Sequence, residues 1–305
     1  MDSVRHFLTL SDFDRASLDS LLALAHELKR DWRAGESSVR LAGRTLGCVF
    51  MKPSLRTRVS FEVGMRQLGG HALYITDQEI GLGKRESVHD VASVLSHMLS
   101  GIMIRTFAQA QVEELAHSSK IPVINGLTDA VHPCQVFCDL FTLQEKGLDL
   151  DKIKVCYLGD GNNMVHSWMD AALAYGFDFW FAGPEGYDPD AGVVARTRAN
   201  GRGQLTLTRS AEDAVRGADV IYTDTWTSMG QEAEAEKRRK VFPPYRLDSK
   251  LLALAAPKAL VLHCLPAHRG EEITDEVMDG PQSIVFEQAG NRLHGQKAIL
   301  AWAMG

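Results

Sequence analysis

The chain has 305 residues, of which 45% are hydrophobic and 24% are charged, and its formal net charge at pH 7 is −6. The negative charge, together with the lack of any long run of lysine or arginine, argues against a nucleic-acid-binding protein. No apolar stretch is long enough to span a bilayer and the first residues have no apolar signal core, so we expect a cytoplasmic protein rather than a membrane protein.

Length and cysteine content narrow the class further. A length of 305 residues exceeds what one hydrophobic core usually serves, which predicts two domains. The five cysteines are odd in number and lie mostly in apolar segments. A disulfide framework is therefore disfavoured, and a reducing compartment fits better.

Apolar runs of strand length alternate with helix-like stretches in the first half of the chain. We predict strands at residues 45–51, 71–75, 101–106 and 121–125. We predict helices at residues 11–30, 56–68, 87–99, 110–119 and 133–146.

The second half repeats this alternation. We predict strands at residues 154–159, 177–182, 204–208, 219–223, 259–263 and 283–286, and a last helix at 291–304. Alternating strands and helices predict an α/β fold: two doubly wound parallel-sheet domains with a cleft between them. The polar segment 146–152 is the best boundary, which gives a domain of 1–147 completed by a returning C-terminal helix at 288–305, and a domain of 148–287.

Residues 54–58, Ser-Leu-Arg-Thr-Arg, stand where the first strand gives way to a helix. Ser54 is placed to cap that helix, and Arg56 and Arg58 lie in its first turn. Unpaired N–H groups at a helix start attract anions, and the arginine fork matches phosphate geometry. A capped surface helix with solvated arginines is the alternative. Because cap, arginines and strand-to-helix junction coincide, we predict a phosphate site.

Five further polar clusters each lie at or just past the end of a predicted strand, at Arg105 and at residues 132–135, 159–163, 224–230 and 263–266. Polar loops past several strands are typical of a ligand site. Taken singly, Arg105 could equally be a solvated charge. A lone histidine is more often structural, but the place of His132 at a helix start beside Pro133 favours a functional role.

Metal and dinucleotide sites are disfavoured by spacing. His132 lies roughly 200° around a helix from Cys134, so it cannot join Cys134 and Cys138 in a zinc site. Residues 159–163, Gly-Asp-Gly-Asn-Asn, lack the G-x-G-x-x-G spacing, and no convincing acidic ribose partner follows. We therefore expect no cofactor and no metal.

The polar residues of the second half have two readings each. Asn162 and Asn163 either cap a helix or offer amide groups to an amino acid. Asp224 either caps a turn or holds a substrate ammonium group. Cys264 is either a core residue or a thiol near the reaction, and a thiol nucleophile needs a paired base that the sequence does not locate.

Together these motifs resemble the carbamoyltransferases, most closely those that act on ornithine. The resemblance runs over essentially the whole chain in family order and is carried by residues 54–58, 132–135, 161–163, 224, 228–230 and 263–266. It implies transfer of the carbamoyl group from carbamoyl phosphate to the δ-amine of L-ornithine, giving L-citrulline and phosphate, by direct attack through a tetrahedral intermediate. It further implies arginine biosynthesis, a carbamoyl-phosphate domain, an ornithine domain, and a homotrimer or a multiple of trimers.

The resemblance also assigns the site residues. Carbamoyl phosphate binding is assigned to Ser54, Leu55 (through its backbone N–H), Arg56, Thr57, Arg105, His132, Gln135, Cys264, Leu265 and Arg292. Ornithine binding is assigned to Asn163, Asp224, Ser228 and Met229. The catalytic groups are Thr57, Arg105, His132, Asp224 and Cys264.

Some positions depart from the family pattern. Leu55 stands where serine or threonine is usual, and Gly290 replaces a common glutamate. The glutamine that often reaches a neighbouring subunit corresponds to Gly81, with Gln78 and Lys84 nearby. Carbamoyltransferases acting on aspartate, N-acylated ornithine or putrescine are the rival family members, and a non-catalytic phosphate sensor is the rival of another class.

Overall fold

The computed structural model describes residues 4–36, 38–199, 202–228 and 230–305. The chain folds into two compact units. Unit 1 comprises Met1–Phe141 and Gly290–Gly305, and unit 2 comprises Thr142–Ala289.

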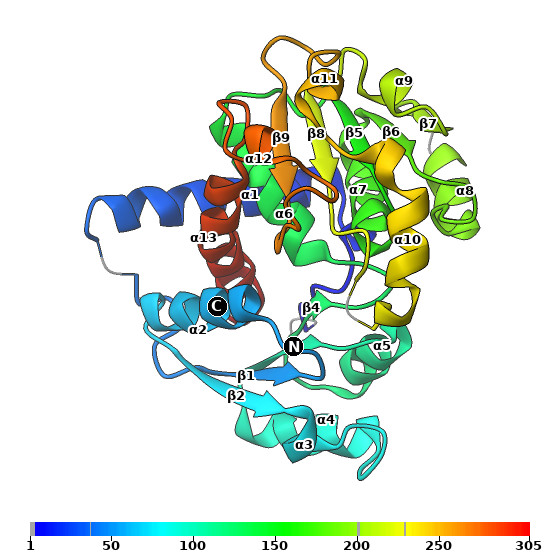
Figure 1. Cartoon of the computed structure of the whole chain (residues 1–305). Helices are drawn as coiled ribbons and strands as arrows, with labels where there is room; N and C mark the ends of the chain where they lie inside the picture. Colours follow the sequence, from blue (N-terminus) through cyan, green and yellow to red (C-terminus); the bar gives the residue numbers. More distant parts are fainter. Residues whose placement is uncertain (1–3, 37, 200–201, 229) are drawn as a thin grey trace. The chain divides into compact units, whose positions relative to one another are not determined.

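Unit 1 is built on a four-stranded sheet in which every strand pair is parallel, and part of this sheet is labelled in Figure 1. In spatial order the strands are β2 (His71–Thr76), β1 (Thr45–Phe50), β3 (Gly101–Arg105) and β4 (Val123–Leu127). Beyond β4 the N-terminal segment adds one bridge, between Phe7 and Ile124. The carboxyl ends of β1, β3 and β4 are therefore neighbours at one edge of the sheet.

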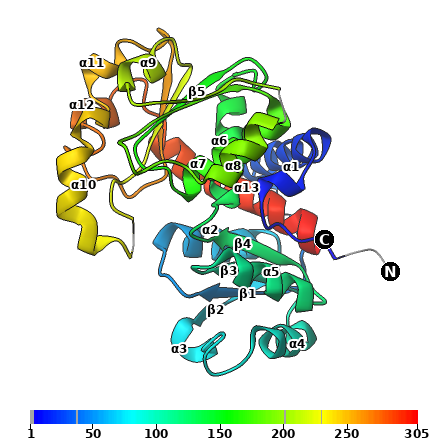
Figure 2. The same cartoon turned by 90° about the vertical axis from the view of Figure 1, so that its right-hand side faces the viewer.

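Helices cover both faces of this sheet, and Figure 2 shows α2 and α4 on opposite sides of it. On the α4 side, Val49, Ile102 and Ile104 pack in one buried cluster with side chains of α4 and α5. The helices are α1 (Arg15–Arg33), α2 (Leu55–Gln67), α3 (Asp77–Ile80), α4 (Val88–Met98), α5 (Gln109–Ser118) and the greater parts of α6 (Pro133–Glu145) and α13 (Val285–Met304). A 3₁₀ turn at Leu10–Asp12 precedes α1, whose cap is Asp14.

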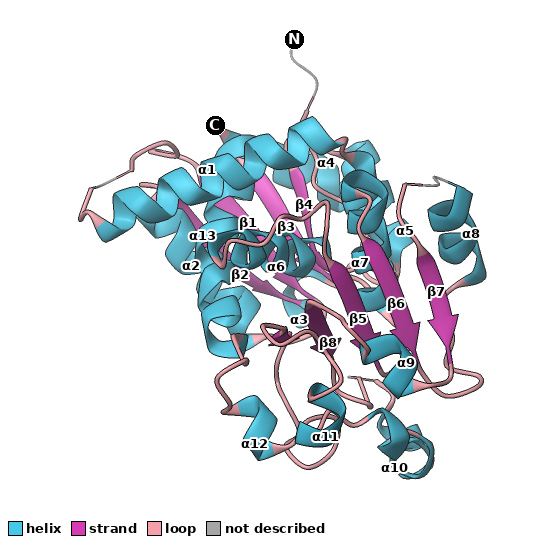
Figure 3. Cartoon of the chain, turned by 90° about the horizontal axis from the view of Figure 1, so that it is seen from above, coloured by secondary structure: helices cyan, strands magenta, loops and turns pink. Residues whose placement is uncertain are grey.

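Unit 2 contains a five-stranded parallel sheet, part of which is visible in Figure 3 as the adjacent strands β5, β6 and β7. In spatial order the strands are β7 (Leu205–Thr208), β6 (Asp178–Ala182), β5 (Lys154–Leu158), β8 (Val220–Thr223) and β9 (Leu260–His263). Its other helices are α7 (Asn163–Tyr175), α8 (Ala191–Ala199), α9 (Ala211–Val215), α10 (Ala235–Val241), α11 (Ser249–Leu252) and α12 (Asp275–Met278), with 3₁₀ turns at Glu232–Glu234 and Pro243–Tyr245.

The predicted fold class is confirmed: both units are parallel α/β structures, and the greater part of the C-terminal helix belongs to unit 1. The strand predicted at residues 283–286 is wrong. Ser283 makes one isolated bridge with Val261, and the chain enters α13 at Val285, well before the predicted start at 291. Short apolar runs do not distinguish a strand from the buried first turn of a helix.

Within the part of the chain that the structure describes, no helix combines the length and the apolar character needed to cross a bilayer.

Candidate active site

The β1–α2 junction has the strand, serine cap and helix start on which the predicted phosphate site rests. Ser54 is the N-cap of α2, where its hydroxyl accepts the N–H of Thr57 at 3.4 Å and donates to the Thr57 hydroxyl at 3.0 Å. Leu55 is the first residue of α2 and is 74% exposed, and its backbone N–H is one of the first-turn donors that have no partner within the helix. The first-turn N–H groups of Leu55 and Arg56 add the positive end of a 13-residue helix.

Arg292 brings the C-terminal helix α13 to this turn. Its side chain is only 3% exposed, and Nη2 donates to the Thr57 hydroxyl at 3.0 Å. Thr57 Oγ1 thus accepts bonds from both Ser54 and Arg292, which leaves its own hydrogen to be donated. Among the described residues Arg292 has no carboxylate partner and its Nε has no hydrogen bond. A buried cation without a counter-ion is costly, so this arrangement calls for an anionic ligand.

Arg105 lies at the end of β3, and His132 lies in the loop that follows β4. Arg105 is the last residue of β3 and is buried, and its carbonyl accepts the N–H of Met51, three residues before Ser54. His132 directly precedes α6 and is also buried. Burial lowers the pKa of His132 well below its usual value, and the charges of Arg292 and Arg105 lower it further. His132 is therefore a neutral imidazole beside two guanidinium groups.

Gln135 lies in the first turn of α6 with 1% of its surface exposed. Its Nε2 donates to Asp139 Oδ1 at 2.8 Å. Its Oε1 is buried and has no hydrogen-bond partner within the described ranges. An unpaired buried carbonyl oxygen is costly unless an N–H of a ligand reaches it.

Asp224 is the centre of a second polar cluster, in unit 2. It follows β8 and is 8% exposed. Its Oδ1 accepts the Cys264 thiol at 2.9 Å and the Thr225 N–H at 2.8 Å, and its Oδ2 accepts Nδ2 of Asn162 at 3.2 Å. The loops after β5, β8 and β9 are thereby joined by one carboxylate.

The two asparagines after β5 differ in role. Asn162 is the N-cap of α7: its Oδ1 accepts the N–H of Met164 at 2.9 Å and the hydroxyl of Tyr157 at 3.2 Å. Asn162 therefore both caps the helix and touches Asp224. Asn163, the residue assigned to ornithine by resemblance, is the partly exposed first residue of α7.

The loop after β9 is held by a buried histidine. His263 Nδ1 accepts the N–H of Leu265 at 2.8 Å, so its proton is on Nε2, which faces Glu272 Oε1 at 3.0 Å. Both side chains are fully buried. Leu265 has φ of 58° and is followed by a cis bond to Pro266. The histidine thus fixes the loop that carries Cys264.

Ser228 lies in the loop after β8, where its N–H donates to Gln231 Oε1 at 3.2 Å and its carbonyl accepts the Gln231 N–H at 3.0 Å. The predicted ornithine ligand Met229 lies outside the described residues.

Two groups of side chains have the composition of a metal site within the described residues. In the first, of Asp224, His263 and Cys264, both ring nitrogens of His263 are already engaged by Leu265 and Glu272. In the second, His268 Nδ1 bonds Thr225, and Glu271 pairs with Arg239. Both groups are thus held by hydrogen bonds and ion pairs of the protein itself.

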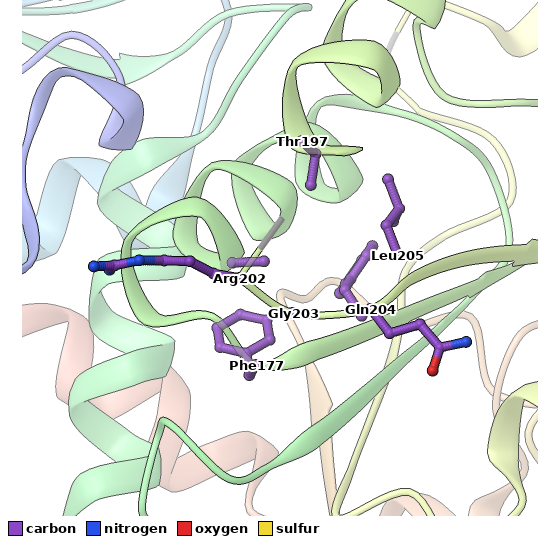
Figure 4. Close-up of a pocket in the computed structure, with 8 residues that line it drawn as sticks. Phe177, Thr197, Arg202, Gly203, Gln204 and Leu205 are labelled. Atoms are coloured by element: carbon purple, nitrogen blue, oxygen red, sulfur yellow. The ribbon is translucent and has the colours of Figure 1, made fainter. Parts of the chain in front are cut away.

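A small cavity in unit 2 is lined by Phe177, Arg202, Gln204 and Leu205, among others (Figure 4). These residues lie at or before the amino ends of β6 and β7, whereas Asp224 and Asn162 follow carboxyl ends. The cavity is therefore not part of the polar cluster around Asp224.

Comparison with known proteins identifies the family. Residues 5–145 match the "Aspartate/ornithine carbamoyltransferase, carbamoyl-P binding domain" and residues 151–303 match the "Aspartate/ornithine carbamoyltransferase, Asp/Orn binding domain". The chain belongs to the aspartate/ornithine carbamoyltransferase family. The resemblance drawn from the motifs is thereby confirmed.

Individual family members are similar over almost their full length. The ornithine carbamoyltransferase of Pelobacter propionicus is 50% identical over 301 residues, 99% of each chain. That of Symbiobacterium thermophilum is 51% identical over 98% of each chain. The structure of the Pyrococcus furiosus ornithine carbamoyltransferase matches with a TM-score of 0.96 at 47% identity, covering 99% of this chain and 98% of that one.

For this carbamoyltransferase, the motifs gave no indication of three residues that shape the unit 2 cluster. Glu272 is hydrogen-bonded to the ring Nε2 of His263, and Gln288 Oε1 accepts the backbone N–H of His263 at 2.9 Å. Arg238 donates hydrogen bonds to Asp160 in the loop after β5 and to Trp226 in the loop after β8. Each acts through folding contacts between segments that are distant along the chain. Burial of charged or amide side chains is the signal that reveals them, and it is available only from the structure.

Proposed function

We propose that the protein is an ornithine carbamoyltransferase: it transfers the carbamoyl group of carbamoyl phosphate to the δ-amine of L-ornithine, giving L-citrulline and phosphate. The observation that carries the donor half is Arg292, a buried guanidinium without a described carboxylate partner, bonded to Thr57 at the start of α2. That arrangement suits a small dianion. The names of the similar proteins supply the acceptor.

Unit 1 is proposed to hold carbamoyl phosphate. Ser54, the N–H of Leu55, Arg56 and Thr57 bind the phosphate at the helix start, with Arg292 completing the positive cluster. The carbamoyl group is bound by Arg105, His132 and Gln135, and the unpaired Gln135 Oε1 is suited to its amino end. A neutral His132 donates one N–H without adding charge.

Unit 2 is proposed to hold ornithine, through Asn163, Asp224, Ser228 and Met229. The bonds from Cys264, Thr225 and Asn162 orient the Asp224 carboxylate. The cluster also includes Asn162, which the resemblance did not assign. Cys264 and Leu265 are proposed to lie where the two substrates meet.

The reaction is proposed to proceed by direct attack. The δ-ammonium of ornithine first loses a proton, because an ammonium has no lone pair, and the amine then adds to the carbonyl carbon. Thr57, Arg105 and His132 donate to the oxygen that becomes negative, and loss of one such donor typically costs about a hundred- to thousandfold in rate. Collapse of the tetrahedral intermediate expels phosphate, which takes up the proton that the attacking nitrogen loses, and Arg56 and Arg292 stabilise the charge of the phosphate.

A product assay tests the proposal. With carbamoyl phosphate, L-ornithine should give citrulline, measured colorimetrically, while aspartate, N-acetylornithine and putrescine in parallel should give little product. If turnover were faster with one of those acceptors, that acceptor and not ornithine would be the substrate. Absence of product with every acceptor would instead favour a phosphate sensor.

A homotrimer is proposed as the assembly, as expected from the family resemblance. Leu55 and Val59 form an exposed apolar pair on α2, and Leu73 is exposed on the edge strand β2. An open groove lined in part by Arg58 and Tyr74 lies between these elements. We expect light scattering to give three times the mass of one chain, or a multiple of it, and Val59→Glu to lower that mass. A native protein with the mass of one chain would contradict this.

The proposed setting is arginine biosynthesis in the cytoplasm. None of the five cysteines is in a disulfide and four of them are buried, which suits a reducing compartment. The citrulline product carries the carbon and nitrogen framework from which arginine is completed.

The buried His132 predicts a specific pH dependence of stability. Its folded pKa lies well below the value of 6.5 that it regains on unfolding. The unfolded state therefore binds the extra proton, and the stability that the neutral ring contributes is present above pH 6.5 and lost as the pH falls, by up to about 1.4 kcal/mol per pH unit. Thermal midpoints between pH 8 and 5.5 should fall less steeply for His132→Gln than for the wild type. Parallel curves would contradict the assignment.

A further inference from the structure

Arg238 is a buried cation outside the residues assigned to the reaction. It lies on α10 within the sequence Lys-Arg-Arg-Lys, residues 237–240, and the other three side chains of that run are exposed. Arg238 itself is 4% exposed. A charged side chain is rarely so buried unless it is paired.

Its guanidinium group reaches two separate loops. Nη1 donates to Asp160 Oδ2 at 2.6 Å and to the Trp226 carbonyl at 2.9 Å. The opposite side of the group pairs with Glu234, one turn earlier, at 3.1 Å. The guanidinium also stacks over the Tyr187 ring, 4.8 Å from its centroid. The position of Arg238 is thus fixed from several directions.

The same two loops carry Asn162, in the loop after β5, and Asp224, in the loop after β8. Asp160 precedes Asn162 by two residues in the loop after β5. Trp226 lies between Asp224 and Ser228 in the loop after β8. Because Asn162 also bonds Asp224, the loops are joined twice: once in the polar cluster and once through Arg238.

The loop after β5 is additionally confined on the Tyr187 side. Gly161 donates its N–H to the Tyr187 carbonyl at 2.9 Å, and a Cβ at Gly161 would lie 2.2 Å from the Pro189 nitrogen. The backbone next to Asp160 is therefore closely confined. The loop after β8 is held at Trp226 by the bond from Arg238 to its carbonyl and by its buried ring, which lies 5.9 Å from the Phe242 ring.

We propose that Arg238 is a positioning residue for the acceptor: it holds the loops after β5 and β8 at the separation that ornithine binding requires. This inference rests on the proposed function. Arginine suits the task because its planar fork serves two acceptors, whereas the ammonium of lysine is a single point charge. A buried ion pair adds little net stability compared with packed apolar residues, so stability alone does not account for it. Burial raises the pKa of Asp160 and the Arg238 charge opposes that rise, so the carboxylate depends on this partner.

The test compares Arg238→Met and Arg238→Lys with a matched control, Arg196→Met. Arg196 on α8 pairs with the buried carboxylate of Asp170 on α7, so the control also removes a cation from a buried acid in unit 2. Apparent KM values for ornithine and carbamoyl phosphate and the thermal midpoint are measured for each. We expect Arg238→Met to raise the ornithine KM by about tenfold or more and leave the carbamoyl phosphate KM within about twofold. Arg238→Lys should be intermediate, and the control should change the midpoint alone.

Several outcomes would overturn the inference. Unchanged KM values in Arg238→Met with a lowered midpoint would make the residue merely structural. An equal rise of the ornithine KM in Arg196→Met would show a general loosening of unit 2. If Arg238→Met does not fold, the same split in Arg238→Lys decides. A wild type that makes no citrulline would overturn the proposed function itself, whereas normal citrulline formation with an unchanged ornithine KM overturns only the inference.

Discussion

Replacing Arg292 with methionine is expected to lower kcat/KM for carbamoyl phosphate about a thousandfold and, at the same time, to stabilise the unliganded protein. The guanidinium is buried without a described carboxylate partner, so its removal relieves a desolvation penalty. The gain should be about 1 kcal/mol or more, which corresponds to about 2 °C in the thermal midpoint. Steady-state kinetics and thermal unfolding without ligand check the two effects.

Lys297 provides the matched control on the same helix. Its side chain is 3% exposed, its Nζ bonds the Leu28 carbonyl at 3.3 Å, and burial lowers its pKa to about 8. Lys297→Met should also stabilise the protein, but with kcat/KM near the wild-type value. Loss of activity in both variants, or loss of stability in Arg292→Met, would remove the distinction between a ligand-binding cation and a structural one.

The start of α2 was predictable because its signals are local. An apolar strand, a serine cap and helical spacing all fall within residues 45–68, and the structure has β1, Ser54 as N-cap and α2 in that order. Arg292 was assigned by family resemblance alone. Its bond to Thr57 joins residues 235 positions apart, and no local pattern reports such a contact.

Other features could not be predicted because they depend on what the tertiary fold buries. Arg238 stands in a basic run typical of a solvated helix surface, yet it alone in that run is buried. Glu272 follows an ordinary polar loop, and its role depends on a fully buried His263. The strand predicted at 283–286 was wrong for a related reason. Ile284 and Val285 are buried as the prediction required, but they lie at the start of helix α13 and not in a strand. Local pattern predicts the elements, whereas burial of polar groups decides their roles.

Asp224→Asn is expected to lower kcat/KM for ornithine about a thousandfold with little change in the carbamoyl phosphate KM. In the native cluster Oδ2 accepts from Asn162 Nδ2, and Asn162 Oδ1 already accepts bonds from Tyr157 and Met164. If an asparagine at position 224 kept its Oδ1 toward Cys264, its Nδ2 would face the Nδ2 of Asn162, and two donors would then oppose each other. The substitution would also remove the negative charge that is proposed to attract the substrate ammonium group.

Asp219→Asn is the control, because Asp219 directly precedes β8 whereas Asp224 follows it. Asp219 Oδ2 accepts the Lys154 N–H at 2.8 Å, a bond at the amino ends of the strands. Its variant should unfold at a lower temperature with both KM values unchanged, since the polar cluster around Asp224 lies at the opposite end of the strand. If Asp224→Asn retained ornithine kinetics within about tenfold of the wild type while Asp219→Asn did not, the acceptor site would have to be moved to the other edge of the sheet.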